Sequence, residues 1–213
     1  MHPNKELAQY FLQRIHHYYP IGLPHFSHGY PGFQELQQIM QDKFSAIERE
    51  EPKTWYDLVK EVQNEWSGYQ VFNSMAAQFP CYEVSVRLAE AAKTGMHIYS
   101  SLILSVSLLV KHYAIVVVDQ YSYQGPEYSG VSHKIVCSGM QHHLELDAKI
   151  QRLKHIVCEF FPEHQYTNHD VLFKYKIQGG YPYNGSYDDL GEYTIYDYLF
   201  SGGLFRQQYT VAH

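Results

Sequence analysis

The spacing of the hydrophobic residues changes along this chain, and that change constrains the fold more than any other feature. Up to residue 68 they recur every three or four positions, as in Leu7, Phe11 and Ile15, which is the period of an amphipathic helix. From Tyr82 they alternate with polar residues, which is the period of a half-buried strand. After residue 140 the helical period returns. Helices that come before and after a run of strands indicate an α+β protein.

Three helices are predicted in the N-terminal part, residues 1–68. Asn4–Tyr19 and Phe33–Glu50 each carry a continuous hydrophobic stripe and are followed by a proline. The third helix opens at Thr54, and Asp57 three residues later gives a capping-box-like arrangement. A helical N-terminal part is therefore expected to pack on the segments that follow.

An antiparallel meander is predicted for residues 80–138. Tyr82, Val84, Val86 and Leu88 alternate with Glu83, Ser85 and Arg87, and in the next strand Ser101, Ser105 and Ser107 stand opposite a run of aliphatic residues. This alternation predicts a sheet with one buried and one solvent-exposed face. Because the turns between these strands are short, their neighbours should be antiparallel, in a sheet of about four to six strands.

One long helix is predicted after the meander, over residues 140–161, followed by a strand and a Tyr-rich C-terminal segment over residues 170–213. Alternation of Val171, Phe173, Tyr175 and Ile177 predicts a strand, and Tyr193 to Phe200 is a candidate short helix. A chain of 213 residues with 45% hydrophobic residues suits a single domain, 1–213.

Charge and hydrophobicity exclude two kinds of partner. The net charge is −6 and no cluster of Lys and Arg is longer than a pair, so we expect no nucleic-acid binding. The most apolar segment, Ile98–Val110, contains four serines and is too short to span a bilayer, so no membrane association is expected. The N-terminal residues do not resemble a signal peptide, which favours a soluble cytoplasmic protein.

The three cysteines, Cys81, Cys137 and Cys158, are widely spaced and predict reduced thiols rather than disulfides. Cys137 is followed closely by His142 and His143 at the predicted strand-to-helix junction, where a helix N-terminus would lower the pKa of a thiol. A Cys–His dyad from these residues is the enzyme hypothesis that the sequence offers.

No metal or other cofactor is expected. Nucleotide-binding glycine loops and hydrolase motifs are absent from the sequence. His143 with Asp147, and His155 with Glu159, would each share a helix face, but the two pairs point in different directions around the helix. Two loops also carry paired histidines, namely His25 with His28 and His164 with His169, and the sequence alone does not place them together.

The Tyr-rich C-terminal segment is the leading candidate binding surface. It contains Tyr181, Tyr183, Tyr187, Asp188 and Asp189 among glycines. Tyrosine rings and carboxylates suit a cationic or polar partner, although the same segment could instead form a lid packed on the sheet.

These features favour a non-enzymatic protein-interaction module, comparable to an inhibitor or an immunity protein, with an acidic Tyr-rich surface. Its expected partner is another protein, and the negative charge favours a basic one. The alternative is a small-ligand-binding protein or an enzyme, with a His- and Cys-lined pocket between the sheet and the N-terminal helices.

Overall fold

The computed structural model describes residues 3–23, 29–93, 95–124, 129–136, 144–183 and 191–200. Within these ranges the chain forms helices and strands in the following order. They are α1 (Pro3–Tyr18), α2 (Pro31–Glu48), α3 (Lys53–Glu65), β1 (Gln70–Asn73), β2 (Cys81–Lys93), β3 (Met96–Ser107), β4 (His112–Gln124), β5 (Ser129–Val136), α4 (Leu144–Phe160), β6 (Gln165–Tyr166), α5 (His169–Lys174), β7 (Lys176–Gly180), β8 (Gly191–Thr194) and α6 (Ile195–Leu199). The predicted α+β class is confirmed.

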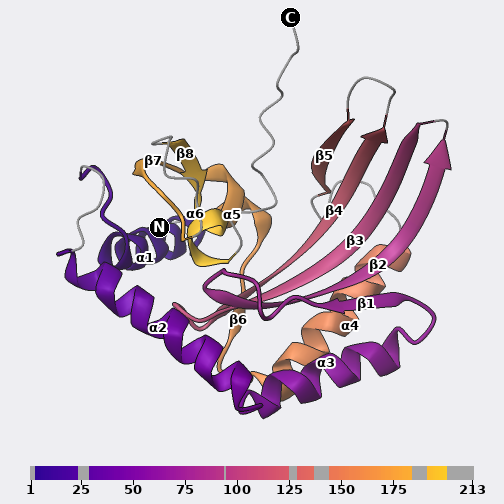
Figure 1. Cartoon of the computed structure of the whole chain (residues 1–213), viewed down its shortest axis with the longest axis horizontal. Coiled ribbons are helices and arrows are strands. Elements are labelled where there is room, and N and C mark those ends of the chain that lie inside the picture. The colour runs from indigo at the N-terminus through magenta and orange to yellow at the C-terminus, as the bar shows by residue number, and fades with distance from the viewer. Residues whose placement is uncertain are drawn as a thin grey trace, which may run out of the picture.

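A six-stranded sheet forms the centre of the molecule (Figure 1). Strands β1 to β5 follow one another in antiparallel order, and the short β6 lies parallel to the start of β4. Val84 pairs with Leu104, and Leu104 pairs with Ile115, so the aliphatic residues of three strands share one face. The predicted meander is therefore confirmed, because its period-two pattern sets the register.

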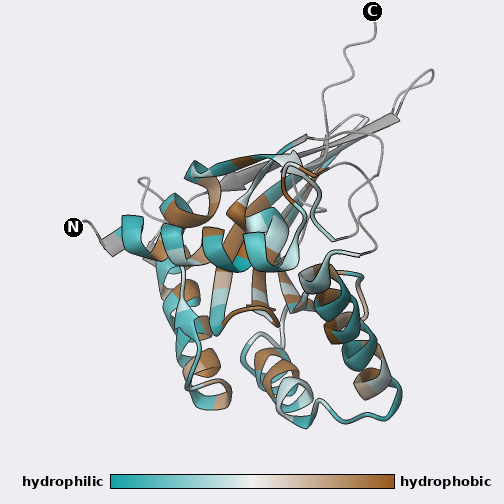
Figure 2. Ribbon diagram, turned by 90° about the vertical axis from the view of Figure 1, so that its left-hand side faces the viewer, coloured by the Kyte–Doolittle hydropathy of each residue, from teal (hydrophilic) through white to brown (hydrophobic). Residues whose placement is uncertain are grey.

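Helices α3 and α4 lie side by side on that face of the sheet (Figure 1). Trp55, Leu58 and Val62 from α3 and Leu153 and Ile156 from α4 are buried there. In Figure 2 the helices are teal on their outer sides and brown where they face the strands. This is the arrangement expected when an amphipathic stripe supplies the driving force for packing.

The second face of the sheet is covered over one half of its length by α1, α2, α5 and α6 (Figure 1). Phe11, Tyr19, Tyr196 and Phe200 are fully buried in this second core. Gly32 allows α2 to begin against the end of α1, since a Cβ atom there would lie 1.6 Å from the carbonyl oxygen of His17. The solvent-exposed face expected from the sequence is therefore wrong for this half, where Ser105 and Ser107 are buried.

The other half of the sheet extends beyond the helices that cover this face (Figure 1). Strand β1 pairs with β2 only as far as Arg87, and an irregularity in the β2–β3 register follows between Arg87 and Ala89. A bulge of this kind bends a strand and ends pairing along its edge. On this half of the sheet the polar residues Ser85, Arg87 and Ser101 remain accessible, as the sequence predicted.

Two local predictions are wrong. Val171 to Ile177 is not a strand, because Asn168 accepts a hydrogen bond from the backbone of Val171 and starts α5, and only Lys176–Gly180 is extended. Thr54 and Asp57 form no capping box, since α3 begins after Pro52 without a side-chain cap. The short helix expected near the C-terminus is present as α6, directly after β8.

In the described part of the chain, no helix is both long and apolar enough to cross a bilayer.

Candidate functional site

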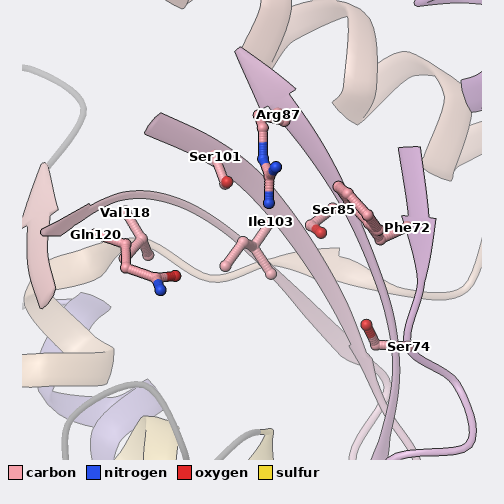
Figure 3. Close-up of a pocket in the computed structure, with 8 residues that line it drawn as sticks. All are labelled: Phe72, Ser74, Ser85, Arg87, Ser101, Ile103, Val118 and Gln120. Carbon is pink, nitrogen blue, oxygen red and sulfur yellow. The ribbon is translucent and has the colours of Figure 1, made fainter. Parts of the chain in front are cut away.

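A trench crosses the open half of the sheet, on the face that the N-terminal helices leave uncovered (Figure 3). Its volume is about 270 Å³. Eight residues line it, namely Phe72, Ser74, Ser85, Arg87, Ser101, Ile103, Val118 and Gln120. We refer to this feature as the sheet trench.

The strand register brings these residues together from β1, β2, β3 and β4. Phe72 stands opposite Ser85, and Arg87 stands opposite Ser101. Ser101 in turn stands opposite Val118. Because side chains alternate between the two faces of a sheet, every second residue of each strand points into the trench.

Arg87 is the central side chain of the sheet trench. Figure 3 shows it running along the sheet so that its guanidinium lies between Ser101 and Ser85. The guanidinium carbon is 4.9 Å from the ring centroid of Phe72 and 4.5 Å from that of Tyr99. Nη1 donates a hydrogen bond to Oε1 of Gln70 at 3.1 Å. Two aromatic rings and one amide therefore fix the position of the cation.

The guanidinium of Arg87 carries N–H donors that no described residue accepts. Its Nε is buried and makes no hydrogen bond to any described residue. Glu83 and Glu90 lie on either side of it along β2, but among the described residues no carboxylate forms an ion pair with Arg87. Asp119, across the sheet, accepts a hydrogen bond from Ser100 on the opposite face. A buried donor without an acceptor is uncommon in a folded protein, and Arg87 is the trench residue in which one occurs among the described residues.

A second polar cluster lies below the trench, where α2 and α6 cover the sheet. Ser105 Oγ donates to Oε2 of Glu83 at 3.2 Å and lies 3.3 Å from the hydroxyl of Tyr196. Burial raises the pKa of Glu83 to about 7. Lys43 Nζ donates to the carbonyl oxygens of Ala77 and Phe79, and burial lowers its pKa to about 8.

The thiol of Cys81 belongs to the same buried region. It donates to the carbonyl oxygen of Phe200 at 3.3 Å, and burial raises its pKa well above the ordinary value. A buried thiol held in the protonated form is a poor nucleophile. This cluster therefore has the character of structural support rather than of a reaction centre.

The residues predicted from the sequence are placed as follows. Cys137, His142, His143, Tyr187, Asp188 and Asp189 lie outside the described residues, as do His25 and His28. Tyr181 and Tyr183 are described, and both are half-buried. Tyr183 packs against the core that contains Tyr19. A recognition role for this segment stays a prediction.

Three histidines gather near β6, at the end of the sheet remote from the trench. His112 Nδ1 lies 3.0 Å from Oγ1 of Thr167, and His112 and His164 interact electrostatically. Burial lowers the pKa of His112, His164 and His169. Among the described residues, however, no group of three His, Cys, Asp or Glu side chains could hold a metal ion.

Sequence reasoning did not single out Phe72, Arg87, Tyr99 or Gln120 as a site. The alternation of polar residues along β2 and β3 was visible in the sequence, but it was interpreted as the solvent-exposed face of a sheet. The informative signal was an arginine at an alternating strand position between the small residues Ser85 and Ala89 in an acidic protein.

Comparisons with protein-family models, with curated proteins and with solved structures found no match for this chain.

Proposed function

We propose that this protein is a non-enzymatic protein-interaction module and that the sheet trench is the centre of its recognition surface. The observation that carries the proposal is Arg87, which contacts the rings of Phe72 and Tyr99 on a part of the sheet that none of the described helices covers. Arginine and aromatic residues are enriched among the side chains that dominate binding energy at protein interfaces. Phe72 is 43% exposed, so a partner would bury substantial apolar area there.

The size of the trench supports a protein partner over a metabolite. At about 270 Å³ it falls at or below the lower end of the range for small-molecule pockets. It would hold one side chain of a partner, with the surrounding strands forming the rim of the interface.

The alternative was a pocket between the sheet and the N-terminal helices. In the described residues that space is filled by Phe11, Ile15, Tyr196 and other buried side chains. Cys81 is the described cysteine at that position, and its protonated thiol does not favour catalysis. Both observations support binding at the surface over a reaction in the interior.

The predicted basic partner rested on the net charge of −6 and on the acidic Tyr-rich segment, whose Tyr187, Asp188 and Asp189 lie outside the described residues. The sheet trench presents a cation instead. The trench is formed by residues that the structure describes, and its geometry supports a binding role.

Site-specific photocrosslinking tests the proposal. A photoreactive phenylalanine analogue would replace Phe72 in one variant and Tyr10 in another, because Tyr10 is 41% exposed on α1 and lies outside the trench. We expect a discrete crosslinked protein from position 72 in the native cell and none of the same mass from position 10. The purified partner should then bind the unmodified chain, with a Kd at least tenfold weaker for Arg87→Ala.

Arg49→Ala is the matched control, because it also removes one positive charge but lies in an exposed ion pair with Glu51. Equal loss of binding in both arginine variants would contradict the proposal. So would identical crosslinks from positions 72 and 10.

A further inference from the structure

We infer that the sheet trench binds a carboxylate, supplied by an aspartate or glutamate side chain of the partner protein, and that Arg87 is its receptor. The inference rests on the proposed function, because it names the chemical group that the recognition surface accepts. It goes further because it assigns an acceptor to the Arg87 N–H donors that no described residue accepts.

The first step concerns the donors. A guanidinium carries five N–H groups, of which one of those on Nη1 is used by Gln70. Nε is buried without an acceptor among the described residues. Nη2 carries two further N–H groups that no described residue accepts and is not among the buried atoms, and a carboxylate matches two parallel N–H groups of one guanidinium edge.

The second step concerns the surrounding side chains. Ser85 and Ser101 lie beside the guanidinium, and Gln120 lies across the trench on β4 (Figure 3). No hydrogen bond joins any of these three side chains to another described residue. Two hydroxyls and one amide can each donate to the remaining lone pairs of a bound carboxylate.

The third step concerns pre-organisation. The rings of Phe72 and Tyr99 lie 4.9 and 4.5 Å from the guanidinium carbon, so they restrict its orientation before a ligand arrives. Less side-chain freedom is then lost on binding, which strengthens binding without any additional contact. The rings also shield one side of the charge from water and strengthen its interaction with an anion.

The fourth step separates a carboxylate from a phosphate. The lining contains one cationic side chain, and phosphoryl groups with nearly two charges are usually held by arginine clusters. Glu83 and Glu90 lie on the same strand, and the whole chain carries a net charge of −6. A dianion would be repelled more strongly than a monoanion, so the geometry favours the carboxylate.

The test uses the uniformly ¹⁵N-labelled full chain and three small probes, read from the side-chain Nε–Hε resonances of arginine. The probes are N-acetylglutamate amide, N-acetylglutamine amide and N-acetylphosphoserine amide. We expect a saturable shift of the Arg87 resonance with the glutamate probe. The neutral glutamine probe, which has nearly the same shape, should bind at least roughly tenfold more weakly, because a charged acceptor strengthens each hydrogen bond.

Three variants serve as controls. Arg87→Gln should abolish the response of the backbone amides of Ser101 and Gln120, and Arg49→Ala should leave it unchanged. Arg87→Lys keeps the charge but lacks the planar fork, so the glutamate probe should bind it several-fold more weakly. Thermal unfolding shows whether Arg87→Gln folds. If it does not, Arg87→Lys and Ser101→Ala replace it in the titrations.

The outcomes separate this inference from the proposed function. Equal affinity for the glutamate and glutamine probes, or tighter binding of the phosphoserine probe, overturns the carboxylate assignment even if crosslinks from position 72 identify a partner. A selective response to the glutamate probe supports Arg87 as a carboxylate receptor even if no protein partner is crosslinked, in which case the proposed function fails and with it the protein source of the carboxylate.

Discussion

Single residues show where this fold tolerates charge in its interior, and Lys43 is the clearest case. It is 3% exposed, and its Nζ lies 2.7 Å from the carbonyl oxygen of Ala77 and 2.9 Å from that of Phe79. Both carbonyls belong to the turn between β1 and β2. Lys43 therefore ties α2 to this turn, and its Nζ also lies 5.6 Å from the ring centroid of Phe44 and 5.8 Å from that of Tyr82.

Replacing Lys43 by methionine tests this role. The methionine keeps most of the volume but leaves two buried carbonyl oxygens without a donor, so we expect a loss of about 2–4 kcal/mol in the free energy of unfolding. Urea denaturation of the full chain gives the measurement. Lys60→Met, at an exposed position of α3, should change stability by less than about 0.5 kcal/mol. Similar values for both variants would contradict the role assigned to Lys43.

Among the elements, α6 is short and depends on its N-terminal cap. Thr194 Oγ1 donates to Oδ2 of Asp197 at 2.7 Å, and the backbone N–H of Thr194 donates to the same oxygen at 2.8 Å. The backbone N–H of Asp197 returns a hydrogen bond to Thr194 Oγ1 at 3.4 Å. The cap positions Tyr196, Tyr198 and Leu199 in the core that supports the sheet.

We expect Thr194→Ala to lower the free energy of unfolding by about 1–2 kcal/mol, since it removes a reciprocal cap that holds a buried helix. The matched control is Thr54→Ala. The sequence predicted the same motif there, but the structure shows no side-chain cap on α3. Its expected effect is within about 0.5 kcal/mol. Chemical denaturation of both variants measures these changes. A larger loss of unfolding free energy for Thr54→Ala than for Thr194→Ala would contradict the capping role of Thr194.

The two threonines also show what a sequence pattern can and cannot predict. Long periodic segments such as Pro3–Tyr18 and the aliphatic strands were predictable, because burial of a whole face selects one period. The short helix α6 was also predictable, but two other short segments were not. Six residues from His169 fit either period, and the cap of Asn168 decides in favour of a helix. Four residues of β1 carry no alternation of buried and exposed side chains.

The candidate site was predictable only in its polarity. The serines and Arg87 could be assigned to one face of the sheet from their alternation. Their separation into a buried cluster and an open trench depends on where α1, α2 and α6 end against the sheet. The contact of Arg87 with Phe72 depends on the pairing of β1 with β2, which no local pattern indicated.

For the molecule as a whole, stability should depend on pH through two opposing groups of residues. His112, His164 and His169 have lowered pKa values, so the unfolded chain takes up protons before the folded chain does as the pH falls below about 6.5. Acidification through them lowers stability. Glu83 has a pKa raised to about 7 from 4.5, so the folded chain holds a proton between these values. Acidification through Glu83 raises stability.

Glu83→Gln separates the two effects, because glutamine resembles the protonated carboxyl at every pH. Below pH 4.5 the variant and the unmodified chain should have similar stability. Between pH 4.5 and 7 the unfolded chain releases this proton while the folded chain retains it, so the variant should become progressively more stable than the unmodified chain, by about 3 kcal/mol at pH 8. Urea denaturation at pH 5 and pH 8 measures this difference. Glu90→Gln is the control, because Glu90 is exposed on the same strand, and its effect on stability should be similar at both pH values. If Glu83→Gln showed the same small difference, the burial of the Glu83 carboxylate would be contradicted.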